Sequence, residues 1–296
     1  MTQQVEYSVR PAAPHEWRHC LSFIPEVLTS SNLPEVFFIA EKSSTNNIIG
    51  VACIVPHLRD VEFPGFPCFI RVLNEYCRLG IGRALVKEIA KHVSEWDVPY
   101  VLSWQSYPIL SQQHYFLSKA GFEPYLSLYS FEVDRASAHI LLRLLDKYLS
   151  RKNDNTQYTL VAVKPTAMSE EVKLYSQHFL VSYDESYRKL EAMLKAEKTS
   201  QLSASIYLAD RCLGFIVGIL DQDGIPKVDF WVTQKNIVHT PVALILLSYF
   251  VKNAYDMGYL HARFECNDKA RSTLNVAKRL NARTILHSQS FALPTL

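Results

Sequence analysis

The sequence predicts a mixed α/β fold that is present in two copies along the chain. Three observations lead to this prediction. Strand-like and helix-like patterns alternate, the few glycines stand at the ends of these patterns, and two landmarks recur at nearly one spacing. The length of 296 residues agrees, because a domain commonly holds about 150 residues. We therefore expect two domains of similar size.

In the first half, short runs of β-branched and aromatic residues predict strands, and apolar residues three or four apart predict the helices between them. Gly80 and Gly82 precede one helical pattern and Gly121 ends the next, as glycines at helix ends commonly do. In chain order, we expect strand 7–10, helix 17–23, strands 36–41, 48–55 and 68–73, helix 82–96, strand 100–104, helix 110–120 and strand 126–133.

A further helix is expected at 136–150, because its apolar residues recur every three or four positions and form one face. The polar stretch 151–157, RKNDNTQ, has the composition of a linker. We therefore place the two domains at 1–150 and 158–296. The apolar face of the helix needs a partner surface, so we expect it to be buried between the domains.

Two landmarks of the first half return in the second half. The segment Gly80–Val86 reads GIGRALV, and His239–Ile245 reads HTPVALI, 159 residues later. The segment Ser118–Phe122 reads SKAGF, and Lys278–Ala282 reads KRLNA, 160 residues later. Two landmarks in one order at nearly one offset predict two copies of one fold.

Composition favours a soluble protein with neither nucleic-acid nor membrane partners. Hydrophobic residues make up 48% and charged residues 20%, which excludes disordered, collagen-like and coiled-coil chains. The halves 1–150 and 151–296 carry net charges of only −2 and +4. The longest apolar stretch, 241–251, is about half of a bilayer span, and the N-terminus lacks the pattern of a secretory signal. Six cysteines without a C-x-x-C pair favour a reducing compartment, so we expect a cytoplasmic protein.

The segment Val72–Leu85, VLNEYCRLGIGRAL, has the features of a phosphate-binding turn. It joins the end of an expected strand to the start of an expected helix through two glycines one residue apart. Glycines let the backbone approach a ligand closely, and the free N–H groups of a helix start favour an anion. No Walker lysine follows, and the third glycine of a dinucleotide fingerprint is missing. We therefore expect a pyrophosphate site of another kind, with a tight turn that binds nothing as the alternative.

With its surroundings, this segment resembles the cofactor loop of the GNAT superfamily of N-acetyltransferases, V-x-P-E-Y-R-x-x-G-I-G-R-A-L. Lys119–Phe122, KAGF, likewise resembles the family's Y-x-K-x-G-F, and the whole resemblance covers about 5–133. Cys77 stands where the family has Arg or Gln, with Arg78 one place later, which removes a usual side-chain contact to the cofactor but leaves the backbone cradle. The matching residues of the loop are Val72, Glu75, Tyr76, Gly80, Ile81, Gly82, Arg83, Ala84 and Leu85.

The resemblance implies a fold, a cosubstrate and an activity. It implies two GNAT-like domains, each with a mixed, largely antiparallel sheet flanked by helices, of which the first carries the acetyl-CoA loop. It implies a metal-free N-acetyltransferase that moves an acetyl group from acetyl-CoA to the amine of a small molecule or peptide. The backbone N–H groups near the end of the fourth strand would bind the thioester oxygen. The implied acetyl-CoA residues are Val72, Leu73, Cys77, Arg78, Leu79, Gly80, Ile81, Gly82 and Arg83.

The second domain resembles the family in the order of its elements but lacks these residues. His239, Thr240 and Pro241 stand at the turn, where Thr240 suits a helix cap and Pro241 suits the first helical position. Proline lacks an N–H group that a phosphate cradle would use. The segment 276–282, VAKRLNA, is similar to the V-A-E-K-L-G-A ending of some GNAT branches. We expect a degenerate, non-catalytic copy, with a second active site as the alternative.

The sequence indicates only weakly which residue would protonate the leaving thiolate. The tyrosine that the family uses as an acid falls on Leu117. Tyr115 lies two places earlier, a rotation of about 200° on a helix, so it faces elsewhere unless the register slips. His114 shares the face of Leu117 and is the better candidate, with an ordinary surface histidine as the alternative.

The sequence indicates the general base equally weakly. No carboxylate falls inside the strand at 68–73, where many relatives keep a base. Glu62, before that strand, and His57 could reach a substrate groove, whereas Glu75 belongs to the loop pattern and is expected to be solvated. A base that acts through a water molecule is the remaining alternative.

Two other functions compete with acetyl transfer. The segment His15–His19, HEWRH, is a literal H-E-x-x-H, the signature of zinc proteases. It lies in the first expected helix, which Pro25 soon ends, and no third ligand follows at the metzincin spacing, so we expect no metal there. The leucine at 117, the cysteine at 77 and the missing strand carboxylate favour the other alternative, a tandem module that binds acyl-CoA without turnover.

Overall fold

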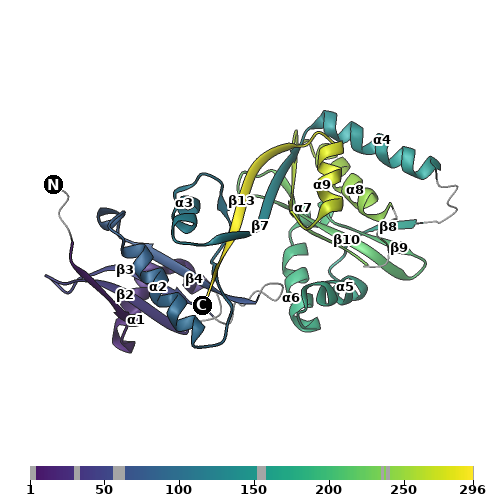
Figure 1. Cartoon of the computed structure of the whole chain (residues 1–296). Coiled ribbons are helices and arrows are strands. Elements are labelled where there is room, and N and C mark those ends of the chain that lie inside the picture. The colour runs from purple at the N-terminus through teal and green to yellow at the C-terminus, as the bar shows by residue number, and fades with distance from the viewer. Residues whose placement is uncertain are drawn as a thin grey trace. The chain divides into compact units, whose positions relative to one another are not determined.

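The computed structural model describes residues 5–29, 34–55, 64–151, 158–234, 237 and 241–295. The chain forms two compact units, which Figure 1 colours along the sequence. Unit 1 consists of Met1–Leu128 and His287–Leu296, and unit 2 consists of Tyr129–Leu286. The units therefore differ from the expected ranges 1–150 and 158–296, because the C-terminal segment belongs to unit 1 and the helix after residue 134 belongs to unit 2.

Unit 1 is built on a mixed, largely antiparallel sheet with the strand order β1-β2-β3-β4-β5-β13. Strands β4 and β5 are parallel, and the other neighbours in this order are antiparallel. The elements are β1 (Tyr7–Pro11), α1 (Trp17–Phe23), β2 (Val36–Lys42), β3 (Ile48–Ile54), β4 (Gly65–Val72), α2 (Ile81–Ser94), β5 (Tyr100–Ser103), β6 (Tyr107–Pro108), α3 (Gln112–Lys119), the first part of β7 (Glu123–Val133) and the last part of β13 (Arg283–Pro294).

Unit 2 is built on a second mixed sheet with the strand order β8-β9-β10-β11-β12-β7. Strands β11 and β12 are parallel, whereas β8, β9, β10 and β11 pair antiparallel in that order. The elements are α4 (Arg135–Arg151), β8 (Tyr158–Ala162), α5 (Ser169–Phe179), α6 (Tyr183–Leu194), α7 (Glu197–Leu202), β9 (Ala204–Leu208), β10 (Arg211–Leu220), β11 (Pro226–Thr233), α8 (Val242–Asp256), β12 (Ala262–Asn267) and α9 (Arg271–Arg279).

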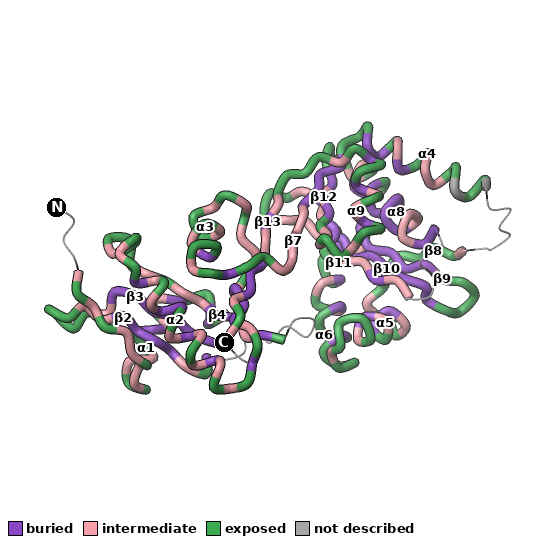
Figure 2. The backbone as a smooth tube through the Cα atoms, viewed as in Figure 1, coloured by how far each residue is buried: buried purple, intermediate pink, exposed green. Residues whose placement is uncertain are grey.

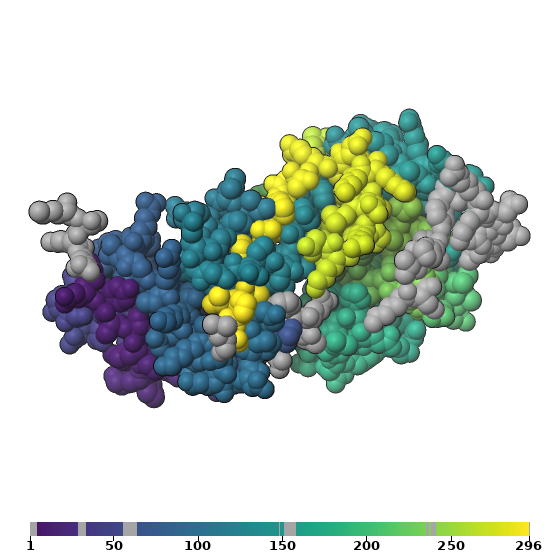
Figure 3. Space-filling view, viewed as in Figure 1, coloured from purple at the N-terminus to yellow at the C-terminus, as the bar shows by residue number. Residues whose placement is uncertain are grey.

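The strand order of unit 2 repeats that of unit 1, so the predicted repeat and the predicted mixed α/β fold are confirmed. Strands β8 to β12 correspond to β1 to β5, and α8 corresponds to α2. The last strand of each repeat is exchanged, however. The end of β13 lies beside β5 in unit 1, and Tyr129–Val133 of β7 lies beside β12 in unit 2. In Figure 3 the yellow atoms of the C-terminal segment lie among the blue and teal atoms of unit 1.

Side chains cover both faces of the unit 1 sheet, whose strands are largely buried in Figure 2. Leu85 and Ile89 of α2 pack on one face together with Phe291 of β13, and all three are fully buried. Cys20 of α1 packs on the other face together with Phe37. Successive strand residues point to opposite faces, so one sheet can serve two cores.

The helix α4 packs on the core of unit 2. Its Leu141 is fully buried together with Leu246 and Phe250 of α8. The expected burial of this helix between two domains is therefore corrected: its apolar face is covered by helix α8 of its own unit. On the opposite face of the sheet, Val172 of α5 and Leu190 of α6 belong to a separate core.

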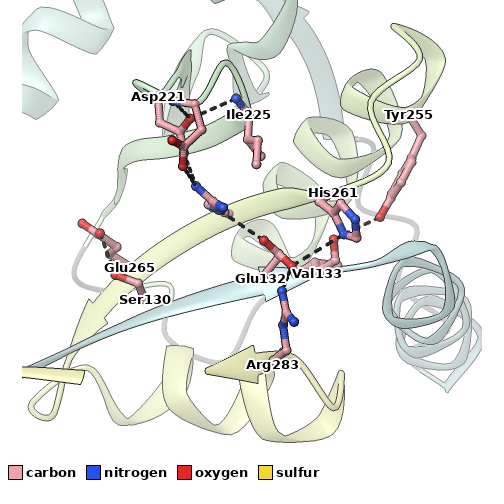
Figure 4. A network of polar contacts seen from close by, with 11 residues as sticks. Ser130, Glu132, Val133, Asp221, Ile225, Tyr255, His261, Glu265 and Arg283 are labelled. Atoms are coloured by element: carbon pink, nitrogen blue, oxygen red, sulfur yellow. Dashed lines mark hydrogen bonds and ion pairs between the residues drawn. The ribbon is translucent and has the colours of Figure 1, made fainter. Parts of the chain in front are cut away.

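A charged network holds the exchanged strand β7 in unit 2 (Figure 4). Glu132 of β7 is only 6% exposed and accepts hydrogen bonds from Arg283 and from Arg263. Arg263 also donates to Asp221 and Asp223, at 2.7 Å each. Burial alone would raise the pKa of Glu132, but the bonds from the two arginines outweigh it and lower that pKa. The carboxylate therefore stays ionised and ties β7 to β12 and β13, and Arg263 extends the network to the turn after β10.

Most elements lie where the sequence predicts them. The helix at 17–23 has these bounds, whereas β4 begins at Gly65, three residues before the expected start. The short strand β6 was not expected, nor were the 3-10 turns Pro14–Glu16, Pro25–Thr29 and Asn74–Tyr76. Among the described helices, none has both the length and the hydrophobicity that crossing a bilayer requires.

Candidate functional site

The hydrogen-bond register of β4 determines which way its backbone groups point. Val55 N–H donates to Pro67 O (3.1 Å), and Leu73 N–H donates to Ile49 O (3.0 Å). The odd-numbered residues of β4 therefore make the hydrogen bonds to β3. The N–H groups of the even-numbered residues point the other way, toward the side on which β5 lies.

Strands β4 and β5 separate before β4 ends. Their pairing extends only as far as Cys68, and Val72 lies four residues further along. The register therefore directs Val72 N–H into the gap between the two strands. Of the two residues expected to supply donors to the thioester oxygen, Val72 thus has an N–H group turned to an open side, whereas Leu73 donates its N–H to Ile49.

The turn between β4 and α2 presents a row of N–H groups. Gly80 is the N-cap of α2, and the N–H of Ala84 donates to Gly80 O (3.1 Å). The N–H groups from Gly80 to Arg83 precede this bond and have no acceptor within the helix. In the part of the chain that the structure describes, no side chain caps them. Four N–H groups at the positive end of a 14-residue helix form a site suited to a pyrophosphate.

The two glycines of the turn are needed for different reasons. Gly80 has a φ of +87°, in the left-handed region that favours glycine, so it shapes the turn itself. Gly82 is helical, and a Cβ atom there would lie 2.8 Å from Cε2 of Phe116. Gly82 therefore allows α2 to approach α3 closely. The G-x-G pattern in this chain thus reflects helix packing as well as ligand access.

The residues between Leu73 and Gly80 contribute unequally to the turn. Cys77 N–H donates to Asn74 O (3.2 Å), so it is used inside the turn, and the exposed thiol lies 3.5 Å from Leu73 O. Arg78 is exposed and has a φ of +67°. The structure therefore leaves Arg78 as the cationic side chain of this loop that faces solvent.

The side chains of Leu79 and Ile81 point inward. Ile81 is 1% exposed in the core under α2, and Leu79 packs against the same core. These two residues can therefore offer only their backbone to a ligand, whereas Arg83 is exposed and can also offer its guanidinium.

The corresponding turn of unit 2 is built differently. Pro241 is the N-cap of α8, not its first helical residue as expected, and its carbonyl accepts the N–H of Ile245 (2.9 Å). Proline offers no N–H group at the place where Gly80 offers one. The expected cap Thr240 lies outside the described residues, as does His239.

His114 lies near the start of α3, the helix that contacts Gly82. Its N–H donates to Ser111 Oγ (3.1 Å), which caps the helix. Its ring is held by β13, because Nε2 lies 3.0 Å from Gln289 Oε1 and the ring contacts Phe291 edge to face. With Nε2 hydrogen-bonded, Nδ1 is the nitrogen through which His114 could exchange a proton with a substrate.

Tyr115 and Leu117 point in opposite directions. Tyr115 is 65% exposed, and Nζ of Lys119 lies 5.6 Å from its ring. Leu117 is buried in the core under α2. Tyr115 therefore faces solvent, as the helical rotation predicts, and the structure does not bring it together with the gap beside β4.

The acidic candidates are not assembled into a site. Glu62 and His57 lie outside the described residues. Glu75 is exposed in the 3-10 turn after β4, as expected. Of the expected acidic residues, the described part of the structure therefore brings none to Val72.

Tyr107 of β6 was not predicted as a site residue from the sequence. Burial, strengthened by the nearby Cys68, raises the pKa of Tyr107 to about 12, and Arg71 and Glu26 lie close enough to influence it. Tyr107 pairs with Gln289 of β13 and packs against the core under α2, and two of the groups that influence its pKa, Cys68 and Arg71, belong to β4. The one local signal is Pro108, because a residue before proline is held extended.

The H-E-x-x-H segment does not have the form that zinc binding requires. Arg10 donates to both oxygens of Glu16 (2.8 Å each), and Ala13 N–H donates to the same carboxylate. The bonds from Arg10 and then from Ala13 lower the pKa of Glu16 to about 2. His15 lies in a 3-10 turn and His19 in α1, so the two do not share one regular helix. Over the described ranges, no three His, Cys, Asp or Glu side chains gather as metal ligands.

Comparison with protein families agrees with this assembly. Residues 3–122 match the family model described as Acetyltransferase (GNAT) family. The match includes the whole turn from β4 into α2 and ends three residues after α3. No curated protein matches the chain significantly.

Solved structures show that the GNAT fold extends over the whole chain. A GCN5-related N-acetyltransferase from Sphaerobacter thermophilus has a TM-score of 0.58 at 12% identity, with 98% of this chain and 96% of that chain covered. A tandem GNAT protein from the clavulanic acid biosynthesis pathway has a TM-score of 0.53 at 12% identity, with 98% and 99% covered. A probable N-acyltransferase from Enterococcus faecalis V583 has a TM-score of 0.59 at 11% identity, with 98% and 73% covered.

Proposed function

Residues 3–122 place this chain in the GNAT acetyltransferase family, and on this premise we propose that it is an N-acetyltransferase that uses acetyl-CoA. Unit 1 carries the active site, and the acceptor is an amine of a small molecule or peptide. Unit 2 is a degenerate copy that binds no cofactor. The six cysteines are free and four of them are buried, which supports a reducing, cytoplasmic location.

In the proposed reaction, the amine nitrogen attacks the carbonyl carbon of the thioester. A C–N bond forms, the C–S bond breaks, the nitrogen loses a proton and the CoA thiolate gains one. Val72 N–H donates to the carbonyl oxygen as negative charge develops on it. Tyr107, a phenol that is protonated at neutral pH, supplies the proton to the thiolate. His114 Nδ1 is the second candidate for proton transfer.

A single observation carries this proposal. Within unit 1, Val72 N–H is turned to the open side of β4, and the same chain segment continues directly into the four free N–H groups at the start of α2. One set of N–H groups suits a thioester oxygen, and the other suits a pyrophosphate. Acetyl-CoA is a ligand that has both groups.

The test has two measurements on the full-length protein. Calorimetry with acetyl-CoA measures binding, and mass spectrometry after incubation with an amine panel measures transfer. We expect one acetyl-CoA per chain and an acetylated amine whose formation releases free CoA. Absence of acetyl-CoA binding would contradict the proposal.

A second candidate function is a tandem module that binds acyl-CoA without turnover. Two observations favour it: Leu117 is buried where the family has its acid, and the described part of β4 contains no carboxylate. This candidate predicts acetyl-CoA binding with no acetylated product from any amine. The two measurements above therefore separate it from the enzyme.

A further inference from the structure

The α1 face of unit 1 carries an ion pair beside the gap in the sheet. Phe69 of β4 packs on this face, and because strand side chains alternate, Arg71 points to the same face. Nη2 of Arg71 lies 2.5 Å from Oε1 of Glu26, which comes from the turn after α1. The side chains remain 42% and 45% exposed, so solvent and ligands can reach both charges.

Two aromatic rings lie next to this pair. The guanidinium of Arg71 lies over the ring of Phe69 at 5.6 Å, and Phe69 meets Trp104 edge to face at 5.6 Å. Trp104 directly follows Ser103, the last residue of β5 that pairs with β4. The cluster of Glu26, Phe69, Arg71 and Trp104 therefore lies where β4 and β5 separate, beside the strand segment that contains Val72.

The ion pair with Glu26 uses only one nitrogen of the Arg71 guanidinium. Among the described residues, Arg71 uses Nη2 for its ion pair, and neither Nε nor Nη1 has a carboxylate partner. A guanidinium can bind a carboxylate through two parallel N–H groups. Burial alone would raise the pKa of Glu26, but a backbone hydrogen bond and Arg71 outweigh it and lower that pKa, so Glu26 stays an anion that attracts an ammonium group.

We propose that this cluster recognises the acetyl acceptor and that the acceptor is an amine that also carries a carboxylate, as an α-amino acid does. The inference rests on the proposed function of the neighbouring cradle. Arg71 binds the carboxylate, Glu26 attracts the amino group before it loses its proton, and Phe69 and Trp104 contact an apolar or aromatic side chain. A purely structural ion pair at this exposure would contribute little to stability.

The test compares L-phenylalanine with phenethylamine, which lacks only the carboxylate. Binding is measured by calorimetry to full-length protein, both free and saturated with CoA. We expect phenylalanine to bind at least about tenfold more tightly, corresponding to about 1.4 kcal/mol. Arg71→Met should remove this preference. Arg18→Met is the matched control, because Arg18 is an exposed arginine of α1 outside the cluster, and it should leave the preference intact.

A second variant addresses the other charge. Glu26→Gln should weaken phenylalanine and phenethylamine alike by about fivefold to tenfold, since both carry the ammonium group. Equal affinity of the wild-type protein for the two probes, binding of neither probe, or an unchanged preference in Arg71→Met would overturn the inference. Acetyl-CoA binding is recorded separately, so a failure of the cradle would be distinguished from a failure of the acceptor assignment.

Discussion

The starts of helices α2 and α8 occupy the same place in two copies of one fold but differ in chemistry. Helix α2 begins with Gly80 at a φ of +87° and leaves four N–H groups without acceptors inside the helix. Helix α8 begins with Pro241, which has no N–H group, and its first residue Val242 is buried. Helix position is conserved between the copies because it fills the core, whereas an anion site needs the glycine backbone as well. Fold and ligand capacity are therefore separable in this chain.

The largest expected effect tests whether the C-terminal strand belongs to unit 1. The comparison above assumes that it does, and it would not hold if each repeat folded from one continuous half of the chain. Phe291 is fully buried in the core of unit 1, although it lies five residues from the C-terminus. Phe291→Ala should destabilise the protein by about 4 kcal/mol, because it leaves a cavity there. Hydrogen exchange should show faster exchange in α2 than in the wild type, with α8 less affected.

The control for this variant is Leu286→Ala, because Leu286 is 42% exposed. It should change stability by less than about 0.5 kcal/mol. If Phe291→Ala instead left α2 as protected as before, the assignment of the C-terminal strand to unit 1 would be wrong.

The next effect tests whether the start of α2 binds the diphosphate of acetyl-CoA. Gly80→Asp should lower acetyl-CoA affinity at least about 100-fold, because a carboxylate would lie beside the diphosphate. Gly80→Asn is the matched control: asparagine also tolerates a positive φ and has the same shape, so it should lose less than about tenfold. Calorimetry on both variants checks this. Similar losses in the two variants would mean that strain, not charge, explains the effect.

A third effect concerns unit 2 alone. Glu132→Gln should lower the free energy of unfolding by about 2 kcal/mol at pH 7, because the bonds to Arg263 and Arg283 lose a charge. The folded-state pKa of Glu132 lies below the ordinary 4.5, so its contribution is complete above that pH. It is lost as the pH falls through the lowered pKa. Denaturant unfolding at pH 7 and pH 3 should therefore show a smaller difference between variant and wild type at pH 3.

The last expected effect compares two tyrosines of unit 1. Tyr107→Phe should reduce kcat about tenfold to 100-fold through loss of the proton donor. Tyr115→Phe should change kcat less than about twofold, because Tyr115 is 65% exposed and faces solvent. Steady-state release of CoA measures both. A larger loss in Tyr115→Phe than in Tyr107→Phe would show that the proton donor lies on α3.

Local sequence patterns were sufficient to predict most of the fold. Helix α1 and the glycine turn before α2 follow from residues that are neighbours in the sequence, and both were predicted. The exchange of β7 and β13 was not, because alternation predicts that a segment is a strand but not which sheet it joins. The same limit explains why Tyr107 and Gln289 were not predicted as residues of the site. Their partners lie in other elements, at a separation of 175 residues for the pair His114 and Gln289.

The exchange of the last strands also determines the order in which the protein can mature on the ribosome. The hydroxyl of Ser103 accepts a hydrogen bond from the N–H of Phe291, 188 residues later, so the strand that completes unit 1 is synthesised only after all of unit 2. Unit 1 therefore keeps an open sheet edge until the segment after Leu286 has been synthesised, whereas Tyr129–Leu286, a continuous segment, can begin to form earlier. The proposed catalytic unit, which starts first, is thus the last to be finished.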